Sequence, residues 1–179
     1  AIFINDERLI GIDPLSTSKA LSTILKKENF DLILSGLQSD DDGHSQTGLL
    51  IAEQLDMTHA SLVVGTKILD NNAIKVKKEL ESGWFQWAEM EMPSSISIQS
   101  GLNKPRYASL KGIMGAKKKR IDTYSIDDMD CEPSDLNSRT KVIKTYVPEK
   151  MKETKYIDGD TDTIVNELIK VLRDEIKAI

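Results

Sequence analysis

The residues best suited to chemistry lie in one polar loop at positions 36–48, which reads Gly-Leu-Gln-Ser-Asp-Asp-Asp-Gly-His-Ser-Gln-Thr-Gly. The loop follows a short apolar segment and leads into a segment with helical periodicity. Open α/β sheets bind ligands where the carboxyl end of a strand meets a helix, and the free N–H groups of a helix N-terminus attract phosphate. The pattern therefore indicates a nucleotide site; the alternative is an acidic surface loop that caps a helix.

Different parts of this loop suit different parts of a nucleotide. Three glycines let the backbone bend and approach a ligand closely: Gly36, Gly43 and Gly48. The helix entrance offers hydroxyl and amide groups on Ser45, Gln46 and Thr47. The carboxylates of Asp40, Asp41 and Asp42 would repel phosphate, but they can accept hydrogen bonds from ribose hydroxyls or the adenine amino group. We therefore expect phosphate on the side of residues 45–48.

Other kinds of site fit the sequence poorly. If Gly43 is the bend of a calcium-binding loop, Gln38 takes the first ligand position and Leu49 replaces the bidentate glutamate, so the ligand count fails. His44 and His59 lie outside the spacings of zinc ligands. The sequence contains neither a nucleophile signature nor a readable pair of catalytic carboxylates. We therefore predict a binding protein without catalytic residues and without a metal site.

A second chemically distinctive segment is strongly basic. It runs over residues 103–120 and ends in four consecutive cations, although the net charge of the chain is −5. Pro105 pre-sets a turn, and Tyr107 and Leu110 offer apolar anchors. Such a segment suits docking on an acidic protein, because charge raises the encounter rate and a protruding leucine supplies a hydrophobic contact. The alternative is a solvated run of charges at a helix end.

Composition narrows the class of protein further. With 179 residues, 39% hydrophobic and 30% charged, the chain fits one globular domain of ordinary size. Its net charge of −5 and pI near 5.2 exclude a general nucleic-acid binder. No apolar run approaches the ~18 residues of a membrane span. The lone Cys131 favours a reducing compartment, and the strand-like start at Ala1, without Met, leads us to expect a missing upstream part.

Short strands and helices alternate along the first half of the chain and would position the polar loop. We expect strands at 1–4, 31–34 and 61–64, and helices at 15–28 and 47–55. Ser16 or Thr17 is the candidate cap of the first helix, whose apolar face would carry Leu21, Ile24 and Leu25. This order is typical of an α/β fold with a doubly wound, mainly parallel sheet.

The second half has a different organisation. Segments 67–69 and 73–81 flank a hairpin turn, and 84–92 and 95–99 read as further strands, so we expect an antiparallel β-ribbon appended to the α/β core. Residues 103–120 should form a loop that becomes helical, and 122–148 an extended arm. Apolar residues spaced four apart predict a terminal helix at 161–179. One face of this helix would pack on a core or on a partner chain through Ile164, Leu168, Leu172 and Ile176.

The polar loop resembles the adenine-nucleotide loop of electron transfer flavoprotein β subunits, in which a Gly and a Gln precede an acidic cluster and Gln-Thr-Gly opens the helix. The resemblance implies that the loop holds AMP as a structural ligand; in electron-bifurcating relatives the same region holds a second FAD. The implied AMP contacts are Gly36, Leu37, Gln38, Ser39, Asp40, Asp41, Asp42, Gly43, His44, Ser45, Gln46 and Thr47. His44 lies where the family varies, and no catalytic role is implied for it.

Residues 102–120 closely resemble the recognition loop of the same family, which corresponds here to residues 98–120. The resemblance implies that Leu110 inserts into a pocket of a partner flavoprotein dehydrogenase, that the lysines tune docking, and that the flavin domain swings to a productive distance. The implied docking residues are Asn103, Pro105, Arg106, Tyr107, Leu110, Lys111, Lys117, Lys118 and Lys119.

Two further stretches agree with this family. Residues 76–93 are similar to its signature but depart from it at Ser82 and Ala88, and residues 138–159 resemble the arm of members that serve methylamine-type dehydrogenases. The family implies an adenine nucleotide α-hydrolase-like, Rossmann-like domain at 1–121. It also implies an arm and helix at 122–179 that contact an α subunit holding most of the FAD. The chain would be an electron carrier lacking the usual N-terminal part, in a prokaryotic cytoplasm or, in a eukaryote, the mitochondrial matrix.

Three other functions stay open on the residues alone. A universal-stress-type regulatory domain would bind ATP without an α subunit and would leave the basic segment unexplained. An ATP-dependent enzyme of the same nucleotide-binding superfamily would need a Ser-Gly-Gly pyrophosphate loop, which this sequence lacks. A structural interaction protein would use the polar loop only as an acidic surface.

Overall fold

The computed structural model describes residues 1–70, 72–148 and 154–178 and divides into two units, Ala1–Lys141 and Val142–Ile179. The first unit extends beyond residue 121, where the sequence predicts the domain boundary. Packing explains the difference, because Ile126, Met129 and Leu136 lie in one apolar cluster with Ala20 and Ile24. Residues 122–141 therefore belong to the first unit.

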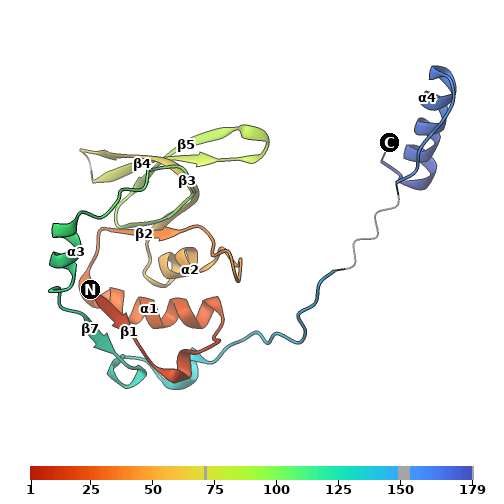
Figure 1. Ribbon diagram of the computed structural model, residues 1–179. Helices are drawn as coiled ribbons and strands as arrows, with labels where there is room; N and C mark the ends of the chain where they lie inside the picture. The colour runs from red at the N-terminus through yellow and green to blue at the C-terminus, as the bar shows by residue number, and fades with distance from the viewer. Residues whose placement is uncertain (71, 149–153, 179) are drawn as a thin grey trace. The chain divides into compact units, whose positions relative to one another are not determined.

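Five strands of the first unit form one mixed sheet (Figure 1). Their order across the sheet is β2 (Leu32–Gly36), β6 (Ser94–Ile98), β3 (Thr58–Leu69), β4 (Ala73–Glu79) and β5 (Phe85–Glu91). Strands β2, β6 and β3 run parallel, whereas β3, β4 and β5 are antiparallel neighbours. A separate parallel pair is formed by β1 (Ile2–Ile4) and β7 (Asp122–Tyr124). The predicted α/β class is confirmed, and the sheet mixes both strand directions.

Strand β6, an interior strand of the sheet, is buried, although its alternation of Ser and Ile is also typical of a strand with one exposed face. Its serine face lies against α2 (Thr47–Gln54), where the buried Ser95 hydroxyl donates to the carbonyl oxygen of Gly48 at 3.2 Å. Ile96 belongs to the apolar cluster formed with β3 and β4. The serines are therefore small packing residues that let a helix approach the strand closely.

The helix α1 (Pro14–Glu28) packs against α2, and most of its buried side chains are small. Its buried residues are Ser16, Ser18, Ala20, Ser22 and Ile24. The predicted apolar positions Leu21 and Leu25 are only half-buried. Gln54 of α2 donates through Nε2 to the Ser18 hydroxyl at 2.8 Å. Ser18 therefore lies at the contact with α2, whereas Ala20 and Ile24 pack in the apolar cluster with Ile126, Met129 and Leu136.

Several local predictions need correction. Asp13, rather than Ser16 or Thr17, caps α1: its Oδ1 accepts a hydrogen bond from the backbone N of Ser16 at 2.9 Å. Segments 61–64 and 67–69 form one strand, β3, with a register shift between Val63 and Gly65. The predicted hairpin turn between β3 and β4 includes residue 71, which lies outside the described residues.

The remaining elements are short. The basic segment contains α3 (Leu110–Ala116). The first unit also has the 3₁₀ helices η1 (Glu7–Leu9), η2 (Glu81–Gly83), η3 (Ile126–Asp128) and η4 (Pro133–Leu136). The second unit has α4 (Thr161–Lys170), which continues into a π-helical turn, η5 (Val171–Glu175), so the helix predicted at 161–179 is not one regular α-helix. Residues 149–153 of the predicted arm and residue 179 lie outside the described part of the chain.

Within the described part, no helix combines the length and the apolar character that crossing a membrane requires.

Candidate functional site

A cleft of about 730 Å³ opens at the carboxyl ends of β2 and β6. One wall is formed by Ser35, Gly36, Leu37, Gln38 and Asp40, and the other by Ile98, Gln99, Ser100, Gly101, Leu102 and Asn103. The walls meet because β2 and β6 are parallel neighbours: Gly36 lies opposite Ile98, and the Leu37 amide donates to the Ile98 carbonyl at 3.2 Å. Small-molecule sites measure roughly 300–1,000 Å³. The cleft therefore has the size of a ligand site.

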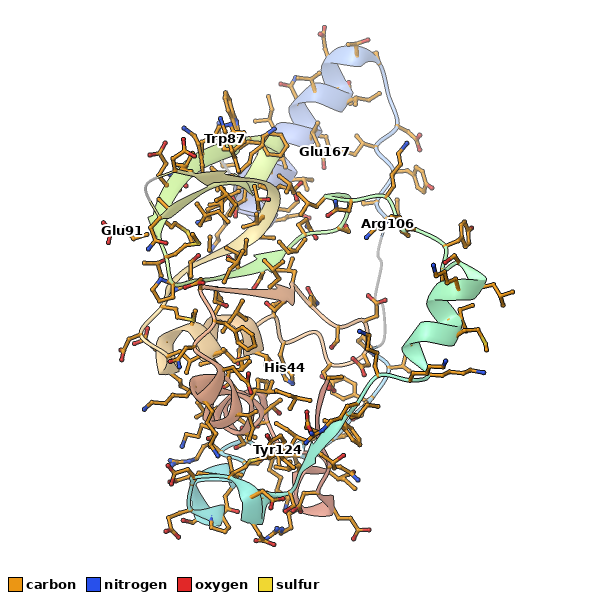
Figure 2. All side chains as sticks on the ribbon, turned by 90° about the vertical axis from the view of Figure 1, so that its left-hand side faces the viewer. His44, Trp87, Glu91, Arg106, Tyr124 and Glu167 are labelled. Atoms are coloured by element: carbon orange, nitrogen blue, oxygen red, sulfur yellow. The ribbon has the colours of Figure 1, made fainter. Side chains whose placement is uncertain are left out.

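Only part of the predicted nucleotide loop lines this cleft. Gly36, Leu37, Gln38 and Asp40 do so, whereas Ser39 and residues 41–47 lie outside its lining. Asp41 ties the loop to itself, because its Oδ1 accepts from the backbone N of Asp42 at 2.8 Å. Hydrogen bonds from the Ser39 hydroxyl and from this amide hold the pKa of Asp41 below its usual value. His44 is exposed in the loop before α2 (Figure 2).

The second wall of the cleft is not predicted from the sequence. Ligands of open α/β sheets bind at the carboxyl ends of parallel strands, and this rule applies to β6 as well as to β2. The rule can be applied to β6 only when β6 is known to lie beside β2, and the sequence does not show this. Gln99 anchors this wall: its backbone N donates to the Val63 carbonyl at 2.9 Å, and its Nε2 donates to Glu79 Oε2 at 3.2 Å. The Gln99 Oε1 accepts from the backbone N of Ser100 at 2.9 Å. The wall is thus held by both β3 and β4.

The N-terminus of α2 has no side-chain cap. Gln46 occupies the cap position without a side-chain hydrogen bond to the helix, and the first turn carries no acidic residue. In contrast, the side chains of Asp13 and Ser109 cap α1 and α3. An N-terminus whose N–H groups lack protein caps is suited to an anion.

The predicted docking segment, residues 103–120, is exposed along its whole length. Within it, the Ser109 hydroxyl accepts from the backbone N of Gly112 at 3.1 Å and so caps α3. No residue of α3 is buried, and Leu110 at its first position is 78% exposed. Arg106 precedes this helix on the same segment (Figure 2). The exposed residues Asn103, Pro105, Tyr107, Lys111, Lys117, Lys118 and Lys119 complete the predicted set. Apolar and cationic groups are therefore presented together, as on a protein-docking surface.

Comparison with known proteins shows the family of the chain. Residues 1–129 match the family model described as "Electron transfer flavoprotein domain". The chain is also 33% identical over 179 residues to "Electron transfer flavoprotein subunit beta" of Methylophilus methylotrophus, an alignment that covers 97% of this chain and 67% of that protein. The chain belongs to the electron transfer flavoprotein β-subunit family.

Other relatives support the same assignment. The protein named "Electron transfer flavoprotein subunit beta" of Bacillus subtilis is 33% identical over 180 residues, covering 100% of this chain and 69% of that protein. The protein of the same name from Bos taurus is 36% identical over 140 residues, covering 76% of this chain and 52% of that protein. The resemblance found in the sequence is confirmed, and this β subunit is a member of a family of electron transfer proteins.

Gly48→Ala is expected to destabilise this electron transfer flavoprotein β subunit at the first turn of α2. A Cβ at position 48 would overlap the Ser35 hydroxyl and lie 3.0 Å from the Ser97 hydroxyl. Overpacking of this kind typically costs about 1–3 kcal/mol. Urea unfolding should therefore show a loss of about 2 kcal/mol in the free energy of unfolding.

A matched control is available in α3. A Cβ at Gly115 would meet no atom within 4 Å, so Gly115→Ala should leave stability unchanged or slightly raised. Adding Ser35→Ala to Gly48→Ala removes the overlapping hydroxyl and should recover part of the loss. If the Gly48→Ala protein is as stable as the original, the close approach of α2 to Ser35 and Ser97 is not needed for stability.

Proposed function

We propose that this chain is the nucleotide-holding and partner-docking subunit of an electron transfer flavoprotein. It binds AMP in the cleft at the carboxyl ends of β2 and β6, pairs with an FAD-binding α subunit, and presents residues 103–120 to flavoprotein dehydrogenases. The observation that carries the proposal is the position of the cleft, at the carboxyl ends of neighbouring parallel strands and beside the loop that resembles the family's nucleotide loop. The first unit would then be an adenine nucleotide α-hydrolase-like, doubly wound domain.

The chemistry of the cleft suits an adenine nucleotide. The amide groups of Gln38 and Asn103 can both donate and accept, which fits the edge of an adenine ring. The Asp40 carboxylate can accept from ribose hydroxyls. The phosphate would bind at the uncapped N-terminus of α2, on the side of residues 45–48. In that position it would avoid repulsion by the carboxylates of the aspartates. AMP here is a structural ligand, and no step of electron transfer passes through it.

The redox chemistry belongs to FAD, which accepts electrons from a dehydrogenase and passes them to a downstream acceptor. The residues of this chain hold the subunits together and orient the dehydrogenase. The second unit supports a role in subunit contact, because α4 carries a row of partly exposed apolar side chains suited to packing on another chain: Ile164, Val165, Leu168 and Ile169. We therefore assign this unit, with the predicted arm, to contact with the α subunit.

Identifying the bound nucleotide tests this proposal. The purified full-length protein, isolated with the subunit it assembles with, is denatured, and the released nucleotides are identified by chromatography. We expect one AMP and one FAD for each pair of subunits. Two FAD would assign the cleft to the second flavin of a bifurcating member, and ATP would favour the universal-stress-type alternative. Release of FAD without any second nucleotide would refute the assignment of the cleft.

A further inference from the structure

We infer that the nucleotide in the cleft also controls how firmly the docking segment, residues 103–120, is held. This inference rests on the proposed function, because it requires a nucleotide at that site. It adds a coupling between two functions that the proposal treats separately, nucleotide binding and recognition of the dehydrogenase. The coupling element is the second wall of the cleft, residues 98–103.

The cleft and the docking segment share a continuous stretch of chain. Leu102 and Asn103 line the cleft, and the docking segment continues directly from Asn103, with α3 beginning at Leu110. The wall itself follows β6 immediately, since this strand ends at Ile98. A ligand that fills the cleft therefore contacts the root of the segment that a partner would recognise.

Beyond this root, the docking segment has few anchors on the rest of the unit. Across the described part of the chain, the hydrogen bonds of residues 103–119 stay inside the segment, for example Ile113 N to Ser109 O at 2.9 Å and Lys118 N to Gly115 O at 3.1 Å. Its far end is fixed where β7 pairs with β1, with Asp122 opposite Ile2. The segment is thus held at two ends, and one of these ends is the wall of the cleft.

Binding at the cleft must restrict such a segment. In the closed form of the segment, Leu102 and Asn103 line the cleft, and in an open form they would swing away from it. The ligand loses both contacts in the open form, so it binds the closed form more tightly. A ligand selective for the closed form suppresses opening by a factor of 1 + [L]/Kd, which is about 100-fold at 100 times Kd. Linkage is reciprocal: the factor by which bound nucleotide raises the affinity for a dehydrogenase that recognises the closed segment is also the factor by which that dehydrogenase raises the affinity for the nucleotide.

Glu79 is a positioning residue for this wall. It lies at the end of β4, outside the lining of the cleft, and its Oε2 accepts the hydrogen bond from Gln99 Nε2 at 3.2 Å. Loss of this carboxylate should loosen the second wall without removing a ligand contact. Glu89 on β5 offers a control, because it is also a strand glutamate whose carboxylate has a side-chain partner, but that partner is Lys75, at 2.9 Å, and not the wall of the cleft.

Limited trypsin digestion tests the coupling. The full-length protein, in the assembly in which it is isolated, is freed of nucleotide and digested with and without AMP, and bound AMP is measured on the same samples. The bond after Arg106 reports on the docking segment, and the bond after Lys155, in the second unit, is the internal control. Saturating AMP should slow cleavage after Arg106 by about 10-fold or more and leave cleavage after Lys155 unchanged.

The Glu79 variant gives an independent readout. Without AMP, Glu79→Ala should be cleaved faster after Arg106 than the original protein, saturating AMP should restore protection, and Glu89→Ala should behave as the original. If AMP binds but cleavage after Arg106 does not change, the coupling is wrong and the proposed function stands. Equal protection after Arg106 and Lys155 would indicate general stabilisation and would also overturn the coupling. Failure of AMP to bind would instead refute the proposed function.

Discussion

Leu110→Ala is expected to lower the second-order rate of electron transfer from the dehydrogenase about 100-fold, because a central hot-spot side chain contributes about 2–4 kcal/mol to docking and 1.4 kcal/mol is tenfold. Leu110 is the first residue of α3 and is 78% exposed, so it is available for burial in a partner. The cap of α3 comes from Ser109 and is not affected by the change. Alanine also has the highest helix propensity, so the helix should persist.

Stopped-flow reduction of the flavoprotein by its dehydrogenase measures this effect, with FAD and AMP contents determined on the same preparation. Both contents should equal those of the unmodified protein. Ile10→Ala is a suitable control, because Ile10 is 80% exposed in the first unit but lies outside the docking segment. If Leu110→Ala loses FAD, or transfers electrons at the original rate, Leu110 is not the docking anchor.

The two segments singled out in the sequence were predictable because their signals are local. The order of apolar segments predicts a loop between a strand and a helix, and β2 and α2 do flank that loop. The run of cations and the nearby Leu110 are likewise visible in residues that are close together in the chain. A local pattern of this kind needs no knowledge of which strands are neighbours.

The second wall of the cleft could not be predicted, because it depends on pairing between distant strands. Gly36 and Ile98 lie opposite each other only because β6 is inserted between β2 and β3. The Ser and Ile alternation of β6 is compatible with a half-exposed strand, and its burial follows from α2, where Gly48 leaves room for serine side chains. The polarity of a serine does not distinguish an exposed face from a closely packed one.

Asp13→Ala is expected to lower the free energy of unfolding of the first unit by about 3 kcal/mol, since a helix cap contributes about 1 kcal/mol and each of two further hydrogen bonds to the carboxylate contributes about 1 kcal/mol. Asp13 is buried, and its Oδ1 caps α1 through Ser16 N at 2.9 Å. Its Oδ2 accepts from the backbone N atoms of Arg139 at 2.6 Å and Thr140 at 3.1 Å. One carboxylate therefore joins the start of α1 to the last residues of the unit.

Asp13→Asn separates the two roles of this carboxylate. An asparagine of the same size has one acceptor oxygen and one NH₂ group, which can only donate. It can therefore serve the α1 cap or the turn at residues 139–140, but not both, and we expect about half the loss seen for alanine. Urea unfolding at neutral pH measures both variants. An alanine variant within about 0.5 kcal/mol of the original, the range of ordinary surface changes, would contradict a structural role.

The same carboxylate should make the stability of the unit acid-dependent. The hydrogen bond from the Ser16 amide, with those from Arg139 and Thr140, lowers the pKa of Asp13 to about 2, against the opposing effect of burial. An unfolded aspartate has a pKa of about 3.9, so the stabilisation is present above about pH 4 and is lost as the pH falls towards 2. The difference in unfolding free energy between the original protein and Asp13→Asn should therefore shrink from pH 7 to pH 3. Because other aspartates titrate equally in both proteins, a difference that stays constant over this range would show that Asp13 does not carry the effect.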